Sequence, residues 1–361
     1  MTRVLCLQQQ PCIRTLKYAV GLRSTGRPFV LGFACQGRTL TEFYGTGDEL
    51  FDGWWHLPAD PAEEIERVVA GFRPDVVHCH NLPDRLTVVA LDVVGGAVPV
   101  VHDVHDLQCL RQTPYEDGFP EPADPLLLEK EAVSGASAVV VVSEQMLEAI
   151  TTRHGLPARV VEFANYATGR DLPKELPPPG RPPGDPLGVV YQGTLSTNGG
   201  HYDLRDHFRS LVAAGVAVHV YPGRPAPEYE DLAAATPGMT CHDRLPPDRL
   251  LQALPQYDFG WAGFNESLNA AHLDTALPNK AYEYLACGLP VLTLRHRALA
   301  RLVEEEGVGL SLASVAELPE RLRGLDFPGL RRRVADCRHR FTVEANIGRI
   351  VALYDDLAGG T

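Results

Sequence analysis

Short apolar runs alternate with helix-like segments along the first half of the chain. The runs have the length and valine content of buried strands, and glycines close two of the helical segments, residues 62–71 and 144–154. Buried strands separated by helices predict a parallel sheet that is covered on both faces. The expected strands are residues 3–7, 28–34, 75–80, 98–104 and 137–143.

A proline-rich stretch interrupts this alternation. Residues 171–186 contain seven prolines and no periodicity, which indicates a stiff linker. The alternation then restarts, so a second α/β segment of similar size follows. Its expected strands are residues 187–193, 217–223, 258–264 and 289–294, and its expected helices are residues 202–214, 227–235, 247–254 and one that begins at Pro278.

The two segments predict two doubly wound domains. We place the first domain at residues 1–170, the linker at 171–187 and the second domain at 188–340. The remaining residues, 341–361, include an amphipathic helix at 341–357 that can reach back to the first domain. Ligands of such sheets bind beyond the carboxyl ends of the strands, so the expected site is a cleft between the domains.

Composition narrows the class of protein. No apolar stretch approaches the roughly 20 residues that span a bilayer, and the N-terminal apolar segment is too short for a signal peptide. Eight cysteines without a C-x-x-C pair indicate reduced thiols rather than disulfides or a zinc site. A net charge of −13 disfavours nucleic acid and anionic membranes as partners. We expect a soluble, cytoplasmic protein, and the high Arg, Ala, Gly and Pro usage suits a GC-rich bacterial genome.

The stretch PNKAYEYLACGLPV predicts a short helix that starts at Pro278 and is closed by Gly288. On a helical wheel Asn279, Lys280 and Glu283 share one polar sector. The unpaired N–H groups and positive dipole at a helix start attract anions, and Lys280 adds a full charge. A solvated ion pair between Lys280 and Glu283 is the alternative.

Further motifs occur in the same order and spacing as in a known family. They are RPDVVHCHN, VPVVHDVHDL, ASAVVVVSEQM and VVEFAN in the first half, and YDFGWAGF, LPNKAYEYLACGLPVL and EEEGVGL in the second. Over residues 75–310 the chain resembles glycosyltransferase family 4 and its relatives with the GT-B fold. The resemblance implies an α/β fold of two Rossmann-like domains that face across a cleft. It also implies sugar transfer from a nucleoside diphosphate donor on the second domain to an acceptor held mainly by the first.

The resemblance assigns donor contacts around the first strand of the second domain. Gly193 and Thr194 match the glycine turn that approaches the phosphates of the donor. Arg244 and Leu245 match the stretch whose backbone meets the base. Small residues at such a turn let backbone N–H groups converge on phosphate, although a plain strand-to-helix turn has the same composition.

The predicted helix at Pro278 carries the other donor contacts. Glu283 matches the family's ribose-binding glutamate, and Lys280 with the amides near Asn279 falls where the diphosphate or the transferred sugar lies. Two departures from the family pattern stand out. No basic residue follows the glycine turn until Arg205, and Thr275 replaces a common glutamate. We therefore expect backbone amides and Lys280 to bind the phosphates.

The catalytic candidates of the first domain follow its strands. His105 matches the acceptor-domain histidine that touches the transferred sugar, and an inverting reaction would need His105 or Asp106 as a base. The loop after the first strand and the HCHN motif border the expected cleft. The candidate catalytic residues are therefore His105, Lys280 and Asp106, and the candidate acceptor contacts are Gln10, Arg14, His80 and Asn81.

A histidine-rich metal site is an alternative for the first domain. His78, His80, Asp103 and His105 lie on neighbouring predicted strands and have the side chains that bind zinc. Transferases of the resembling family need no metal, so we expect neither a metal nor a cofactor beyond the nucleotide sugar as co-substrate. His78 has an alternative role as a core histidine with satisfied hydrogen bonds.

The resemblance also implies a reaction. We expect retention at the anomeric carbon and a small soluble acceptor, in secondary metabolism or the synthesis of a glycan precursor, because no basic amphipathic surface helix for lipids stands out. Three alternatives remain. They are a nucleotide-sugar epimerase of the same fold, a non-catalytic partner derived from a glycosyltransferase, and a histidine-rich metal hydrolase.

Overall fold

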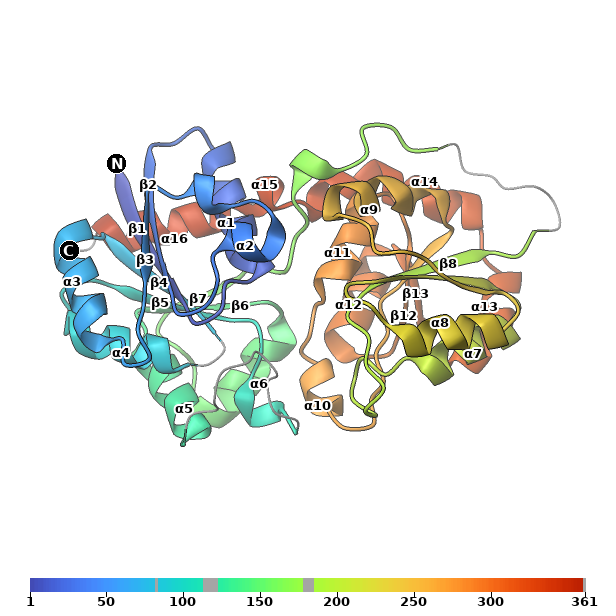
Figure 1. The fold of residues 1–361 in the computed structure, drawn as a ribbon, viewed down its shortest axis with the longest axis horizontal. Coiled ribbons are helices and arrows are strands. Elements are labelled where there is room, and N and C mark those ends of the chain that lie inside the picture. The colour runs from blue at the N-terminus through green and yellow to red at the C-terminus, as the bar shows by residue number, and fades with distance from the viewer. Residues whose placement is uncertain (82–83, 113–122, 178–184, 360–361) are drawn as a thin grey trace. The chain divides into compact units, whose positions relative to one another are not determined.

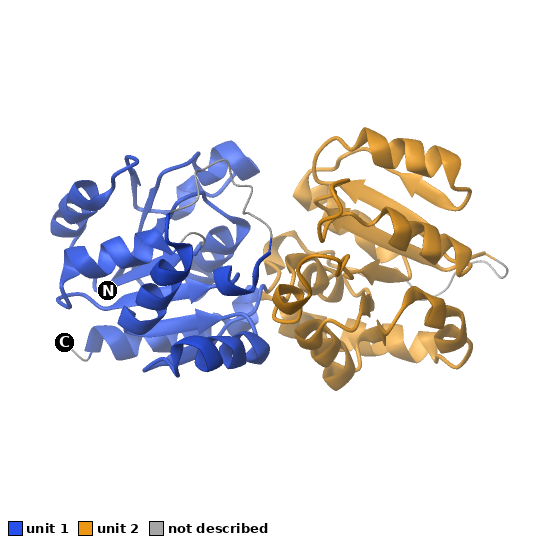
Figure 2. Ribbon diagram, turned by 90° about the horizontal axis from the view of Figure 1, so that it is seen from below, with its two compact units in different colours: residues 1–165, 343–361 blue, residues 166–342 orange. Residues whose placement is uncertain are grey.

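The computed structural model describes residues 1–81, 84–112, 123–177 and 185–359. The chain divides into two compact units, coloured separately in Figure 2. Unit 1 comprises Met1–Asn165 and Val343–Thr361, and unit 2 comprises Tyr166–Thr342. Part of the predicted linker, residues 178–184, lies outside the described residues.

Unit 1 is built on a parallel sheet with the strand order β3-β2-β1-β4-β5-β6-β7 (Figure 1). Its strands are β1 (Thr2–Gln8), β2 (Phe29–Cys35), β3 (Gly53–His56), β4 (Val76–His80), β5 (Val100–Val104), β6 (Ala138–Val141) and β7 (Val160–Glu162). Its helices are α1 (Ile13–Ser24), α2 (Leu40–Tyr44), α3 (Ala62–Phe72), α4 (Arg85–Val94), α5 (Pro125–Gly135), α6 (Glu144–His154), α15 (Val343–Asn346) and α16 (Gly348–Gly359).

Alternation along β4 explains how both faces of this sheet are covered. Successive side chains of a strand point to opposite faces. Val77 and Cys79 belong to a core cluster that also contains apolar residues of α3 and α4. His78 points to the other face, where its ring meets Tyr18 of α1 and Tyr354 of α16. The last helix of the chain is thus part of the packing of unit 1.

Unit 2 has a parallel sheet with the order β10-β9-β8-β11-β12-β13. Its strands are β8 (Gly188–Gly193), β9 (Ala217–Pro222), β10 (Met239–Cys241), β11 (Phe259–Trp261), β12 (Val291–Leu294) and β13 (Gly309–Leu312). Its helices are α7 (Arg205–Ala213), α8 (Pro227–Ala235), α9 (Pro247–Ala253), α10 (Ala270–Leu273), α11 (Asn279–Ala286), α12 (Arg297–Glu306), α13 (Leu318–Arg323) and α14 (Phe327–Cys337). A large core cluster joins β8, β9 and β11–β13 to α7, α8 and α13.

The predicted fold class is confirmed, because both sheets are parallel and packed with helices. Every expected strand forms, although the strand expected at residues 258–264 has only three residues, Phe259–Trp261. The single final helix expected at 341–357 is wrong. The chain forms two helices there, α15 and α16, and Ile347 separates them.

None of the helices among the described residues combines the length and the apolar character that crossing a bilayer requires.

Candidate functional site

Helix α11 is fixed at both ends as a short element. Pro278 caps its start with an extended backbone, φ −70° and ψ 146°, so the helix begins one residue later than predicted. Gly288 has a φ of +77° and closes the helix in the left-handed region, as predicted. The Tyr284 ring packs on Gly260 of β11, where a Cβ atom would lie 2.2 Å from the ring. This contact holds α11 against the sheet.

Lys280 turns into the interior of unit 2. It is 9% exposed, and its Nζ donates a hydrogen bond to the Tyr191 hydroxyl over 2.9 Å. Three rings surround the amine, at 4.0 Å to the centroid of Tyr191, 5.3 Å to Phe264 and 5.6 Å to Tyr202. The alternative of a solvated Lys280–Glu283 pair is therefore wrong. Burial lowers the pKa of Lys280 to about 7, although the nearby Glu283 carboxylate opposes this shift.

Glu283 connects α11 to the end of β8. Its carboxylate accepts a hydrogen bond of 2.6 Å from the Gln192 side-chain amide. The backbone N–H of Gln192 donates to the Tyr284 hydroxyl over 3.0 Å. A carboxylate has about four lone-pair positions, so a carboxylate of this kind can accept several hydrogen bonds.

The glycine turn after β8 meets the start of α11. Gly193 has a φ of +120°, which is strained for other residues, and its carbonyl accepts the Gly223 N–H over 2.8 Å. A Cβ atom on Gly193 would lie 3.8 Å from Nζ of Lys280. Thr194 is exposed, and its carbonyl accepts a hydrogen bond from the Tyr191 hydroxyl. Tyr191 thus joins the turn to Lys280.

The structure brings most of the predicted donor residues together. Gly193, Thr194 and Lys280 are linked through Tyr191, and Asn279 and Glu283 lie on the same helix as Lys280. Sequence reasoning missed the aromatic residues around the amine. One of them, Tyr191, could have been found from the sequence. Alternate residues of the strand GVVYQG point to the same face, which places Tyr191 on the core face of β8.

Arg244 and Leu245 lie in the loop between β10 and α9. Arg244 is exposed and Leu245 is partly buried. His242, at the start of this loop, stacks on Tyr221 of β9 with a centroid distance of 4.4 Å and an interplanar angle of 8°. The predicted contact of Arg244 and Leu245 with a base stays a prediction.

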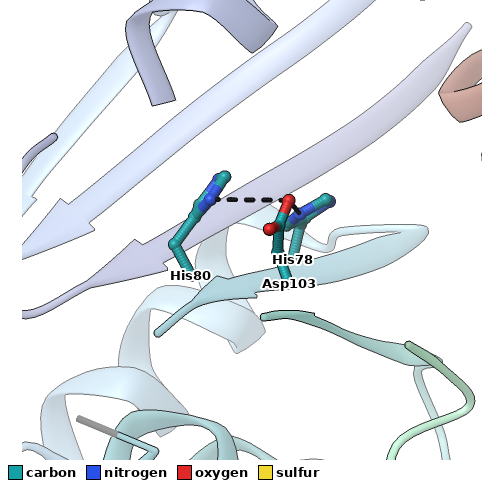
Figure 3. A group of neighbouring side chains, drawn as sticks. All are labelled: His78, His80 and Asp103. Atoms are coloured by element: carbon teal, nitrogen blue, oxygen red, sulfur yellow. Dashed lines mark hydrogen bonds and ion pairs between the residues drawn. The ribbon is translucent and has the colours of Figure 1, made fainter. Parts of the chain in front are cut away.

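Asp103 is the centre of a buried polar cluster in unit 1. His78 and His80 of β4 approach it from the neighbouring strand (Figure 3). The His78 Nε2 lies 3.3 Å and the His80 Nδ1 3.8 Å from the Asp103 Oδ2 atom. Ligand atoms of the three residues lie within 4.8 Å of one another, a spacing that would suit a metal ion. Three of the four residues of the predicted metal alternative are thus in one place, and His105 is not part of this group.

Asp103 already has a cationic partner, however. The Arg14 Nε donates to Oδ1 over 2.8 Å, and the Tyr18 hydroxyl donates to Oδ2 over 2.5 Å. Burial opposes ionisation of Asp103, but the Arg14 guanidinium and the hydrogen bond from His78 hold its pKa well below its usual range. A guanidinium in this place disfavours a second cation, so the cluster is better suited to an internal ion pair than to a metal.

Arg14 uses its remaining donors within unit 1. It donates to the carbonyls of Phe163 and Ala164, over 2.7 and 3.2 Å, and to the Asn165 side chain over 3.0 Å. Arg14 is 2% and His80 1% exposed. Burial, the neighbouring His78 and Arg14 lower the pKa of His80 well below its usual range. For these two residues, contact with an acceptor stays a prediction.

Asn81 holds the backbone beneath His105. Its side-chain oxygen accepts the His105 N–H over 3.0 Å, and its amide donates to the Asp106 carbonyl over 2.5 Å. His105 and Asp106 follow β5 and are partly buried. Burial lowers the pKa of His105, so its imidazole is mostly neutral at pH 7. Among the described residues the buried Nδ1 of His105 has no hydrogen-bond partner.

Gln10 lies over Gly37, where a Cβ atom would stand 2.1 Å from the Gln10 Oε1 atom. Its Nε2 is buried and makes no hydrogen bond within the part of the chain that the structure describes. Sequence reasoning missed Tyr18 and Tyr354, the hydroxyl partners of Asp103 and His78. Their helices come from sequence positions far from β4 and β5, so spacing along the chain carried no signal for them.

Comparison with known proteins identifies the class. Residues 14–166 match the family model of the glycosyl transferase 4-like domain, and residues 189–339 match that of the glucosyltransferase 3-like C-terminal domain. The predicted resemblance is thus confirmed. The chain has the GT-B fold, and its two domains match the glycosyl transferase 4-like and the glucosyltransferase 3-like C-terminal families. None of the curated proteins matches the chain in sequence.

Solved structures share the whole fold at low sequence identity. Sucrose-phosphate synthase from Thermosynechococcus elongatus superimposes with a TM-score of 0.69 and 16% identity, covering 100% of both chains. HepE from Anabaena in complex with UDP has a TM-score of 0.70 and 13% identity, over 99% of this chain and 100% of that chain. A putative UDP-N-acetylglucosamine 2-epimerase from Listeria monocytogenes has a TM-score of 0.63 and 15% identity, over 99% and 97%.

Proposed function

We propose that the chain is a glycosyltransferase that moves a sugar from a nucleoside diphosphate sugar to a small acceptor. One observation carries the proposal. Lys280 and Glu283 share one short helix, and Lys280 meets the Gly193 turn, within the unit that matches the glucosyltransferase 3-like domain. The solved complexes of HepE with UDP and with UDP-glucose support a donor of this kind, because the two chains share one fold.

The donor is bound by unit 2 in this proposal. The diphosphate lies at the start of α11, where the positive end of the helix dipole and Lys280 offer positive charge. The backbone amides that follow Gly193 add hydrogen-bond donors, since no basic residue follows this turn until Arg205. The ribose hydroxyls donate hydrogen bonds to the Glu283 carboxylate, which also accepts from Gln192.

The transfer proceeds with retention and without a metal. The acceptor oxygen forms a bond to the anomeric carbon on the face from which the diphosphate leaves, and the acceptor proton passes to a donor phosphate oxygen. Charge develops on the leaving phosphate, so fixed donors there lower the barrier by several kcal/mol. His105 orients the sugar with its imidazole, and Asn81 keeps the His105 backbone in place.

The acceptor is a small soluble molecule bound by unit 1. Polar groups after β1 and β4, such as Gln10 and Asn81, border the strand ends where ligands of doubly wound sheets bind. Arg14 and His80 are buried beneath this region, where both contact the Asp103 carboxylate.

A binding panel tests the proposal directly. Thermal unfolding of the purified chain is followed with UDP, GDP, TDP and their sugars, and with adenosine diphosphate as a comparison. We expect one nucleotide family to raise the melting temperature, and Glu283→Ala to reduce that shift. No shift with any nucleotide would refute the transferase and favour a non-catalytic partner protein.

An epimerase of the same fold is a second candidate, since the structure of a putative epimerase from Listeria monocytogenes matches 99% of this chain. The two functions differ in their need for an acceptor. An epimerase converts the nucleotide sugar alone, which nuclear magnetic resonance of the anomeric proton detects. A transferase leaves the sugar unchanged or releases it slowly to water until an acceptor is added.

A further inference from the structure

Lys280 has an unusual environment for a residue that binds phosphate. Its amine lies among the rings of Tyr191, Tyr202 and Phe264 and makes a single hydrogen bond within the described residues, to the Tyr191 hydroxyl. No carboxylate among these residues forms an ion pair with it. An ammonium ion has three N–H donors, so a charged Lys280 would have donors left over in a buried place. Burial of such a charge is costly.

The hydroxyl of Tyr191 can accept a hydrogen bond from Lys280 whether the amine is neutral or charged. It donates its own proton to the Thr194 carbonyl and therefore accepts from Nζ. Tyr191 is a positioning residue, because it sets where Nζ lies relative to the Gly193 turn. The shift of the Lys280 pKa to about 7 agrees with this geometry, since burial is its main cause.

Few other groups face the amine. Glu283 lies one turn further along α11, and Tyr191 and Tyr202 come from β8 and the following loop. Behind the rings, His201 contacts Tyr202 and Phe264, and His296 contacts Phe264. Burial lowers the pKa of His296 to about 4, so His296 stays neutral across the neutral range.

We propose that unit 2 takes up one proton at Lys280 when it binds the donor diphosphate, so that the amine is neutral in the free protein and charged in the complex. The inference rests on the proposed function. The proton comes from solvent and adds to the lone pair of Nζ, and no covalent bond of the donor changes. The new ammonium ion keeps its bond to Tyr191 and turns its remaining N–H groups to phosphate oxygens.

Proton uptake gives the binding equilibrium a definite dependence on pH. Consider a group whose pKa is near 7 in the free protein and much higher in the complex. At a pH well below 7 this group is already protonated, so donor binding takes up almost no proton. Well above this pKa, uptake approaches one proton, and the association constant falls as pH rises. An ordinary lysine, charged in both states, would leave binding unaffected across the neutral range.

Isothermal titration calorimetry in pairs of buffers with different ionisation enthalpies measures this uptake. The probe is UDP-glucose, or GDP-mannose or TDP-glucose if the panel selects it, because both phosphates of these donors are esterified and stay charged. We expect uptake near zero at about pH 6 and near one proton at about pH 8.5. The association constant should fall about eightfold between about pH 7.5 and about pH 8.5.

Lys280→Arg is the matched control. A guanidinium stays charged at every accessible pH, so this variant should bind the donor with no proton uptake. Donor binding by the native protein without uptake at about pH 8.5 would overturn the inference while leaving the proposed function intact. Unchanged uptake in Lys280→Arg would also overturn it, since the proton would belong to another group. Failure of every nucleotide sugar to bind would instead refute the proposed function.

Discussion

Removal of the Arg14 guanidinium should destabilise unit 1 strongly. Arg14 and Asp103 form an ion pair of 2.8 Å whose side chains are 3% and 0% exposed. Arg14→Met keeps much of the aliphatic stem but leaves the Asp103 carboxylate buried without a cation. It also removes the donors that satisfy the carbonyls of Phe163 and Ala164.

The magnitude follows from these contacts. Loss of one partner of a buried ion pair costs about 3–5 kcal/mol, because the stranded charge cannot be solvated. Each buried carbonyl left without a donor costs about a further 1 kcal/mol or more. With two such carbonyls, we therefore expect a loss of about 5–7 kcal/mol. That is a large part of the about 5–15 kcal/mol that stabilises a typical domain.

Urea unfolding followed by far-ultraviolet circular dichroism measures this loss. Arg27→Met is the matched control, because Arg27 also pairs with an aspartate, Asp355, over 2.7 Å, but both side chains are more than two-fifths exposed, 46% and 43%. The control should change the midpoint little. Equal midpoints for the two variants would refute the reasoning that burial gives the Arg14 pair its importance.

The same ion pair predicts a dependence of stability on pH. The pKa of Asp103 is held well below that of the unfolded chain, so its stabilising contribution is present above the unfolded pKa of about 4. The contribution is lost as pH falls through the lower, folded pKa. Asp103→Asn lacks this ionisation, so the difference in stability between it and the native protein should shrink as the medium is acidified below about pH 4.

Three further predictions concern the site and the sheet of unit 2. Glu283→Gln should weaken binding of the donor by about tenfold in calorimetry, because an amide is a poorer acceptor for ribose hydroxyls than a carboxylate; an unchanged affinity would exclude the ribose contact. His105→Ala should lower kcat by about a hundredfold while the Kd of the donor stays within a factor of about three, and equal effects on both would assign His105 to binding alone. Gly309→Ala should lower the melting temperature, because its Cβ would lie 1.9 Å from the Val291 carbonyl oxygen and force β12 and β13 apart. Gly348→Ala is the control and should leave the melting temperature unchanged, because no atom lies within 4 Å of the added Cβ.

The local pattern of the sequence predicted the fold well where elements are long and apolar. The run at residues 137–143 forms β6, and the segment at 144–154 forms α6 with Ser143 as its N-cap. Short strands such as β7 and β10, of three residues each, carry too little periodicity to be seen. The final helix was predicted as one element because an interruption at Ile347 leaves the apolar periodicity almost unchanged.

Only the parts of the site that are formed by consecutive residues could be predicted from the sequence. The helix start at Asn279 and the glycine turn at Gly193 are written in consecutive residues, and the structure joins them. The burial of Lys280 was not predictable, because a helical wheel places it beside Glu283 in a polar sector. Its ring partners Tyr202 and Phe264 come from loops whose position depends on the folded sheet.

Helix α16 has a consequence for the order in which the molecule is made. Tyr354 supplies the hydroxyl that meets the His78 Nδ1 atom over 2.7 Å, and Arg27 near the start of the chain pairs with Asp355. Tyr354 and Asp355 are synthesised after all of unit 2. The packing of unit 1 is therefore completed only after unit 2 has been translated, while unit 2 is a continuous segment that can fold first.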